Sequence, residues 1–496
     1  MHIGLDIGTS GTKAALVGTD GSVAGSFQVS YGFADTADGH RALDAGEVWE
    51  AVKTCLEALG SLGEVETITV STLGEAVIPM DRAGEPLALS ITGTDRRGIC
   101  ETAALEETVG LMHLIDITGL NPTSIYSAGK LVWMKREMPE LYEAAWKIPL
   151  FQDYVIYRLC GRAVIDYSSA SRTQLFDIGT MDWSEELLGK TGIDREKLSR
   201  PVPAGTVAGT IRKELAEELG LSASARIVAG THDHICNALG SGVFEVGSCA
   251  NTVGTTEGLT AVLRREQLSS EYVNRYQISC EPFVRPGLFN TVAWENTSGV
   301  LLRWFAEEFM REEPAGELIA TFEKLNGRMK REPTKLLVLP HFSGAASPYG
   351  DGRSKGAILG LTLDTEREDI YKALMEGANM ELALILEGLT KAGLAVGHLV
   401  STGGALSPQL LQIKADVLGI PIHTVESRQT GALGGAILGA VAAGAYGDVK
   451  EAVSAMVRTG KTYEPDPGRS RIYKERLALY RQIYPAIAGI SHGLGE

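Results

Sequence analysis

A strand, a Gly-Thr turn and a second strand occur twice in this chain of 496 residues, and this repeat most constrains its fold. The first copy is MHIGLDIGTSGTKAALVGTDGSV, in which apolar residues alternate as in a β-strand on either side of the turn. The second copy, NTVGTTEGLTAVLRR at 251–265, follows about 245 residues later. Two unrelated hairpins in a glycine-rich chain are the alternative. We favour an internal duplication, which predicts two similar halves at 1–245 and 246–496.

Helical patterns fall between the expected strands. Residues 45–59 carry apolar side chains at helical spacing, and 370–392 is apolar nearly all round, as in a buried helix. Ser407 and Pro408 before QLLQIKADVL, with Gly419 after it, are the start and stop signals of a third helix. Strands that alternate with helices in both halves predict the α/β fold class.

Composition and charge limit the classes of partner. The net charge is −16 and no basic stripe is present, so neither nucleic acid nor an anionic membrane surface is an expected partner. Asp6 stands where a signal peptide needs apolar residues, and 434–445 is too short and glycine-rich to span a bilayer. The six cysteines are scattered without a CxxC pair, which indicates reduced thiols in a cytoplasmic protein.

The first Gly-Thr turn is a candidate phosphate loop. Backbone N–H groups at Gly8, Thr9 and Ser10 can cradle a phosphate, as successive amides do in other glycine-rich turns. Lys13 can add positive charge, and the carboxylate of Asp6 can reach an accompanying Mg²⁺. The alternative is an ordinary hairpin with no ligand.

Two further turns strengthen the prediction of a nucleotide site. Gly254, Thr255 and Thr256 form a second turn of the same kind, and two opposed loops can hold a polyphosphate from both sides. Gly403 and Gly404, in VSTGGALSPQLLQ, follow an expected strand and let the backbone approach a flat base or ribose. A tight strand-to-helix turn without a ligand is the alternative for this third element.

These three turns, with an isolated acid in GTHDH, resemble the FGGY family of carbohydrate kinases over nearly the whole chain. DIGTSGTKAAL at 6–16 is similar to the opening phosphate loop of its xylulokinase-like members. IYSAGKLVWMKRE at 125–137 resembles the K-x-x-W helix of the family, through Lys130 and Trp133. FQDYVIYRLCGR and SSASRTQLFDI also follow the family pattern, and STGGALSPQLLQIKADVLGIPI at 401–422 resembles its adenosine-binding turn and helix.

The resemblance implies two actin-like (ribonuclease H-type) ATPase domains that form a cleft, with sugar mainly against 1–245 and nucleotide mainly against 246–496. It implies ATP as the phosphate donor, Mg²⁺ near Asp6 and Asp233, and a place for Ser407 in the adenosine pocket beside the Gly-Gly turn. Asp233 falls on the general base of the family, which takes the proton of the attacking hydroxyl. A small sugar is the implied partner, and related kinases often form homodimers.

The two histidines beside Asp233 have a second interpretation, as metal ligands. A zinc site needs a further ligand that the sequence does not supply. On an extended segment His232 and His234 would point to one face, away from Asp233. We therefore expect them to pack or hydrogen-bond inside the fold, with sugar contact by His234 as the alternative.

The loops that resemble the substrate region are atypical. VSTLGEAVIPMD at 70–81 has neither the Gln-Met-His-Gly of xylulokinase-like sequences nor the Gln-Arg-Glu-Thr of glycerol kinase-like ones. Glu75 matches the glycerol-type glutamate, which accepts bonds from hydroxyls, but no arginine precedes it and Ile125 replaces a tyrosine. In TGTDRRG, Asp95 is similar to an aspartate of xylulokinase-like enzymes and Arg96 follows it, although a surface ion pair is the alternative.

The leading hypothesis is an ATP-dependent sugar kinase, a phosphotransferase with an alcohol group as acceptor. A ketopentose such as xylulose is the first choice of substrate, and a polyol or another ketose is the competitor. A non-catalytic sugar or nucleotide sensor, an actin-like ATPase and a His-dependent metal hydrolase are the other classes. The presence of Asp6, Asp233 and both Gly-Thr loops favours the enzyme.

Overall fold

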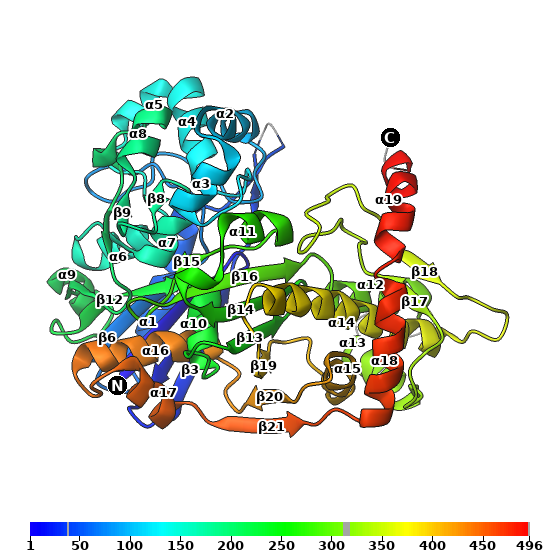
Figure 1. Ribbon diagram of the computed structural model, residues 1–496. Helices are drawn as coiled ribbons and strands as arrows, with labels where there is room; N and C mark the ends of the chain where they lie inside the picture. Colours follow the sequence, from blue (N-terminus) through cyan, green and yellow to red (C-terminus); the bar gives the residue numbers. More distant parts are fainter. Residues whose placement is uncertain (37–38, 311–317, 495–496) are drawn as a thin grey trace.

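Two mixed β-sheets, one from each half of the chain, organise the computed structural model (Figure 1). The structure describes residues 1–36, 39–310 and 318–494. The first sheet has the order β11-β12-β6-β1-β2-β3, with bounds Val207–Thr210, Arg226–His232, Thr67–Thr72, His2–Ile7, Gly11–Val17 and Val23–Ser30. The second has the order β15-β16-β14-β13-β19-β20-β21, with bounds Glu281–Pro282, Phe289–Glu295, Glu257–Leu263, Ser248–Val253, His398–Thr402, Ile422–Val425 and Thr459–Tyr463.

The two sheets share one local arrangement. β1 pairs antiparallel with β2 and parallel with β6, while β13 pairs antiparallel with β14 and parallel with β19. The Gly-Thr turns connect β1 to β2 and β13 to β14, so both predicted hairpins are confirmed. The α/β fold class is confirmed as well, because helices alternate with these strands in both halves.

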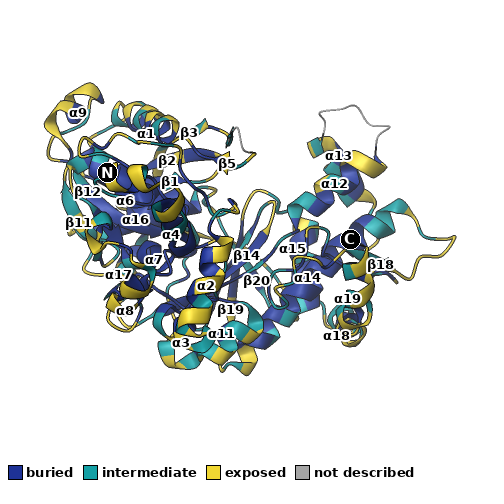
Figure 2. Ribbon diagram, turned by 90° about the horizontal axis from the view of Figure 1, so that it is seen from above, coloured by how far each residue is buried: buried dark blue, intermediate teal, exposed yellow. Residues whose placement is uncertain are grey.

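The three helices expected from sequence signals are present. α1 (Ala45–Gly60) packs on β2 and β3, and the long α14 (Arg367–Lys391) is buried along most of its length (Figure 2). α15 (Pro408–Leu418) begins where the Ser407 hydroxyl accepts a hydrogen bond from the Leu410 N–H at 3.1 Å. Gly419 ends this helix in the left-handed conformation that favours glycine.

Further helices surround the sheets. Those that gather above the first sheet in Figure 1 include α2 (Ile99–Val109), α3 (Leu111–Thr118), α4 (Ser127–Glu137), α5 (Pro139–Ala144) and α8 (Glu185–Thr191). α12 (Gly299–Phe309), α13 (Leu318–Arg328), α18 (Pro467–Tyr480) and α19 (Ile483–Gly493) lie on the side of the second sheet. In the described ranges, no helix combines the length and apolar character needed to cross a membrane.

The glycine-rich helix α16 (Thr430–Ala443) belongs to the second half of the chain but packs on the first sheet, against β1 and β6. A Cβ added at Gly4 would stand 1.8 Å from the carbonyl oxygen of Ala432. A Cβ at Gly434 would stand 1.9 Å from the carbonyl oxygen of Cys236 in α10 (Asp233–Gly240). Glycine at these positions therefore allows α16 to approach both the sheet and α10 at backbone contact distance.

Candidate active site

Two cavities share a wall at the start of α10. The first has a volume of about 640 Å³ and is lined by residues of both halves, among them Asp6, Lys13 and the Gly403–Gly404 turn. The second has a volume of about 350 Å³ and also takes residues from both halves. Asp233 and His234 line both cavities. A ligand in one cavity can therefore meet a ligand in the other at the carboxylate of Asp233.

The carboxylate of Asp233 lies at the junction of β12 and α10. Its Oδ1 accepts a hydrogen bond from the His234 N–H at 2.6 Å. Burial favours the neutral acid, but His232, His234, the backbone N–H and Arg172 together hold the pKa of Asp233 below its ordinary value. Asp233 is therefore ionised at neutral pH, which is the state required of a proton acceptor.

The orientation expected for the two histidines is wrong. The chain does not stay extended through GTHDH, because β12 ends at His232 and α10 begins at Asp233. The Nε2 atom of His232 lies 3.3 Å from Oδ1 of Asp233, so this ring contacts the carboxylate instead of facing away from it. The ring centroids of His232 and His234 lie 5.3 Å apart. Burial lowers the pKa of His232, which keeps this imidazole neutral at pH 7.

Asp6 faces the first cavity from β1, where Gly431 leaves room for its side chain. A Cβ at Gly431 would stand 2.6 Å from Oδ2 of Asp6. Burial, and then the charge of Asp233, raise the pKa of Asp6 to about 6, while Lys13 and His234 act in the opposite direction. The cavity thus holds two carboxylates whose mutual repulsion a bound cation can relieve.

The raised pKa of Asp6 predicts a pH-dependent stability. An unfolded aspartate titrates near 3.9, so between about pH 4 and pH 6 the unfolded chain releases the Asp6 proton before the folded protein does. We expect the free energy of unfolding of the ligand-free wild type to fall across this range relative to the Asp6→Asn variant. Urea unfolding of both proteins from pH 3.5 to pH 7.5 measures this, and a difference that is constant with pH would contradict it.

The two Gly-Thr turns use some of their amides internally. The Gly8 N–H donates to the carbonyl of Gly11 at 3.0 Å, and the Gly254 N–H donates to the carbonyl of Thr256 at 2.9 Å. Thr9, Ser10, Thr255 and Thr256 are exposed at the turns, and Thr9 and Thr256 both line the second cavity. The turns of the two halves therefore face one space, but that space is the second cavity, and none of the Gly-Thr turn residues is among those that line the first.

The third turn lies where the sequence places it, at the end of β19. Gly403 and Gly404 line the first cavity. Gly403 has φ of +118°, and a Cβ there would stand 2.1 Å from the carbonyl oxygen of Val253, so only glycine fits. A Cβ added at Gly404 would meet open space. Ser407 caps α15 and is not among the residues that line this cavity.

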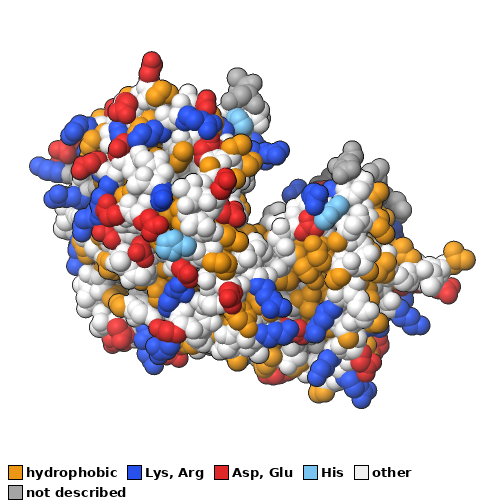
Figure 3. Space-filling model, turned by 45° about the horizontal axis from the view of Figure 1, so that its top comes forward, with side chains coloured by type: hydrophobic (Ala, Val, Ile, Leu, Met, Phe, Trp, Pro, Cys, Tyr) orange, Lys and Arg blue, Asp and Glu red, His pale blue; other side chains and the backbone are white. Residues whose placement is uncertain are grey.

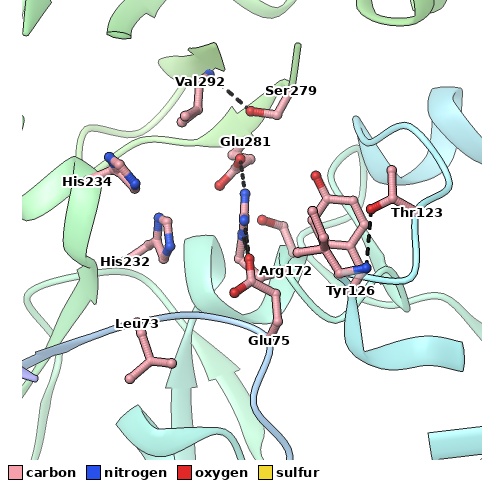
Figure 4. Close-up of polar contacts among 12 residues, drawn as sticks. Leu73, Glu75, Thr123, Tyr126, Arg172, His232, His234, Ser279, Glu281 and Val292 are labelled. Atoms are coloured by element: carbon pink, nitrogen blue, oxygen red, sulfur yellow. Dashed lines mark hydrogen bonds and ion pairs between the residues drawn. The ribbon is translucent and has the colours of Figure 1, made fainter. Parts of the chain in front are cut away.

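Glu75 enters the second cavity from the loop that follows β6. It takes a left-handed backbone conformation with φ of +66°, which is uncommon for a residue other than glycine. Its carboxylate accepts hydrogen bonds from Arg172, which also lines the cavity (Figure 4). An arginine therefore lies beside Glu75, but it comes from a distant part of the chain and not from the residue before it.

Asp95 and Arg96 do not line this cavity. The side chain of Asp95 is fully buried and bound to Arg97, with Nη2 2.6 Å from Oδ2, whereas Arg96 is exposed. The alternative of a surface ion pair between Asp95 and Arg96 is wrong, because the buried carboxylate of Asp95 pairs with Arg97. The backbone N–H of Arg97 bonds the same carboxylate, so Asp95 fixes the bend of its own loop.

Lys130 of the K-x-x-W helix has a structural position beneath the second cavity. It is fully buried in α4, and its Nζ donates to the carbonyls of Ser124, Ile125 and Tyr126, at 3.0 Å for Ile125. Ile125 and Tyr126 line the cavity. Lys130 therefore holds the segment that presents these two side chains.

Sequence reasoning missed several polar residues at the site. Asn237 of α10 donates to the Thr252 hydroxyl at 2.5 Å and accepts from Thr430 of α16, so it ties both halves at the first cavity. Arg172 stands in SSASRTQLFDI, where a single arginine among small polar residues could have marked it. Glu281, which bonds Arg172, carries no local signal.

Models of the FGGY family of carbohydrate kinases match both halves. The N-terminal domain model matches residues 1–240 and the C-terminal domain model matches residues 249–443. The xylulose kinase of Staphylococcus xylosus is 25% identical over 489 residues, which are 97% of this chain and 99% of that protein. The gluconokinase of Bacillus licheniformis is 26% identical over 497 residues, which are 98% of this chain and 96% of that protein.

The fold agrees with these matches. The crystal structure of xylulose kinase from Rhodospirillum rubrum has a TM-score of 0.88 at 25% identity and covers 99% of each chain. This likeness confirms the fold of two actin-like ATPase domains, and the family models confirm the resemblance seen in the sequence. The chain therefore belongs to the FGGY family of carbohydrate kinases, which are ATP-dependent phosphotransferases.

Proposed function

We propose that this kinase transfers the γ-phosphoryl group of ATP to a hydroxyl of a ketopentose such as xylulose. The observation that carries the proposal is the position of Asp233, whose ionised carboxylate lines both cavities. Asp233 accepts the proton of the sugar hydroxyl while that oxygen forms a bond to the γ-phosphorus and the bond to ADP breaks. Relatives named xylulose kinase from two genera support the choice of sugar.

The proposed roles follow the two cavities. Nucleotide occupies the first cavity, mainly against 246–496, with adenosine at the Gly403–Gly404 turn. The two Gly-Thr loops, whose Thr9 and Thr256 line the second cavity, hold the terminal phosphate where the cavities meet, and Lys13 approaches the phosphates from the first cavity. Sugar occupies the second cavity, mainly against 1–245, where Glu75 and His234 contact its hydroxyls.

Further sequence-based assignments complete this arrangement. Ser407 acts by fixing the start of α15 beside the adenosine, since its hydroxyl bonds a backbone amide of that helix. Asp95 and Arg96 lie outside the cavity and serve the sugar site only through the shape of their loop. We also retain a cytoplasmic location and a homodimer as predictions.

The residues at the first cavity fit Mg²⁺. Asp6 and Asp233 present carboxylate oxygens, the ligand type that Mg²⁺ prefers, and the raised pKa of Asp6 is relieved by a nearby cation. No cluster of three or more His, Cys, Asp or Glu suited to a metal ion occurs in the described part of the chain. Mg²⁺ usually takes one or two carboxylates together with substrate phosphates. When bound, it would neutralise charge on those phosphates.

A polyol is the second candidate substrate, and one observation favours it. Glu75, which matches the glycerol-type glutamate, lines the second cavity. Its carboxylate can accept hydrogen bonds from adjacent hydroxyls of a polyol as readily as from those of a ketose. The cavity therefore suits either class of neutral carbohydrate.

A phosphorylation screen tests the proposal. Release of ADP from MgATP should depend on added carbohydrate, with the highest kcat/KM among ketopentoses, and should be measured over ketopentoses, ketohexoses and polyols. Release of ADP at the same rate without carbohydrate would support an ATPase. Binding of carbohydrate or nucleotide with no release of ADP would support a sensor.

A further inference from the structure

Arg172 joins the two halves of the protein inside the second cavity. It follows α7 (Tyr167–Ser171) in the first half, and its Nε donates to Oε1 of Glu75 at 2.5 Å. Its Nη1 donates to Oε1 of Glu281 at 3.0 Å, and Glu281 lies in β15 of the second sheet (Figure 4). The centroid of the Tyr126 ring lies 5.1 Å from the guanidinium carbon of Arg172. Contacts on three sides leave little of Arg172 available to a ligand.

Negative charge exceeds positive charge around this cavity. Glu75 and Glu281 share one guanidinium, and the carboxylate of Asp233 lines the same space. Burial alone would raise the pKa of Glu281, but Arg172 and then His232 hold it below its ordinary value, so Glu281 is ionised. Its Oε2 is buried and has no hydrogen-bond partner in the described ranges.

We propose that Glu75 and Glu281 neutralise Arg172 and thereby restrict the sugar site to uncharged carbohydrates, with Glu281 as a specificity-determining residue. A hydroxyl can donate to Glu75 and accept from a nearby donor, whereas a carboxylate can only accept. A sugar acid would bring an anion close to Asp233 and Glu75, whereas Arg172, the one Lys or Arg among the described residues that line this cavity, is already paired with two carboxylates. Such like-charge contacts exclude competing ligands in other specific sites.

Because of the position of Glu281, the selection against charged sugars also depends on the second half of the chain. Glu75 and Arg172 come from the first half, but Glu281 comes from the second, and its side chain is completely buried behind the guanidinium. Charge balance at the sugar site therefore depends on both halves being in place. Glu281 does not line the cavity, so it acts through Arg172 and not by contact with the substrate.

The inference rests on the proposed kinase function, and its test compares neutral and acidic substrates. We expect the wild type to phosphorylate ketopentoses or pentitols but not the corresponding pentonates. Glu281→Gln keeps the shape of the side chain and frees positive charge on Arg172. It should raise the ratio of kcat/KM for pentonate to kcat/KM for the best neutral substrate at least about tenfold, which is about 1.4 kcal/mol in the transition state.

Controls separate this effect from general damage. Glu101→Gln removes a buried carboxylate that pairs with Arg136 in the same half, outside the cavity, and should leave the ratio unchanged. Should Glu281→Gln fail to fold, Glu75→Gln replaces it, with the same expected direction. Calorimetric titration with pentitol and pentonate in the presence of ADP gives a readout that does not require turnover.

The outcomes distinguish the two proposals. Phosphorylation of pentonates by the wild type, or an unchanged ratio in folded Glu281→Gln, overturns the charge selection and leaves the kinase proposal standing. Absence of phosphorylation of any carbohydrate overturns the proposed function. Binding then tests the charge selection by itself. The wild type should bind the neutral compound more tightly than the acid, and this preference should be smaller in Glu281→Gln.

Discussion

Asp233→Asn should reduce kcat for sugar phosphorylation by between about 100-fold and 10,000-fold, the range lost when a positioned general base is removed. Asparagine keeps the size of the side chain and can still accept a bond from the His234 N–H, so α10 should begin as it does now. The variant cannot take the proton of the attacking hydroxyl. Nucleotide binding should stay near that of the wild type, because the turn at Gly403 and Gly404 is unchanged.

The measurements are steady-state kinetics with the best substrate of the screen and calorimetric titration with ADP. Asp182→Asn is the matched control, since the side chain of Asp182 is half-buried, pairs with Arg195 at 2.7 Å and lines neither cavity. It should retain wild-type kcat. Turnover of Asp233→Asn within a few-fold of the wild type would remove Asp233 from the role of base.

Lys414→Met should lower the free energy of unfolding by about 3–5 kcal/mol, the cost of leaving a buried charge without its partner. Lys414 of α15 forms an ion pair with Glu257 of β14, and the two side chains are 0% and 1% exposed. Glu257 also accepts from Asn251 and Ser298, at 2.8 Å each. Those neutral donors cannot replace the cation, so Glu257 would remain a buried and poorly compensated anion.

Urea unfolding of the full chain, followed by tryptophan fluorescence, measures this loss. The double variant Lys414→Met/Glu257→Gln should recover much of the stability, because it removes both charges of the pair. Lys450→Met is the control, since its ion pair with Glu245 at 3.0 Å is solvent-exposed and should contribute less than about 1 kcal/mol. If Lys414→Met lowered the free energy of unfolding by less than about 1 kcal/mol as well, the buried ion pair would not have the expected effect.

The sequence correctly predicts those parts of the fold that depend on local patterns of residues. The alternation on either side of each Gly-Thr turn specifies a hairpin, because a strand repeats every two residues. Ser407, Pro408 and Gly419 specify α15, because helix ends need side-chain or glycine caps wherever they lie. Because the signal at Ser407 is local, it specifies a helix cap but does not show whether the residue lines a cavity.

The parts that the sequence does not reveal depend on contacts between distant segments. Arg172 meets Glu75 and Glu281 across 97 and 109 residues, and no spacing rule connects them. The position of α16 on the first sheet is equally non-local, although its glycines hint at close packing. The orientation predicted for the histidines at GTHDH is wrong because the sequence has no clear signal that the strand becomes a helix at Asp233.

On the face shown in Figure 3, acidic and basic side chains are interspersed over both lobes and form no continuous basic area. The chain as a whole carries a net charge of −16. Local charge at the sugar site, and not the surface as a whole, is what distinguishes between carbohydrates. Glu75, Arg172 and Glu281 supply that charge from inside the fold.

The crossing of α10 and α16 also determines how the molecule can move. With backbone in contact with backbone at Gly434, the two helices have no flexible side chains between them that could absorb sliding. Because α16 also packs on β1 and β6, the two helices and the first sheet form one stiff unit. Asp233 opens α10 and Asp6 lies in β1, so we expect these two carboxylates to keep their relative positions when the lobes move.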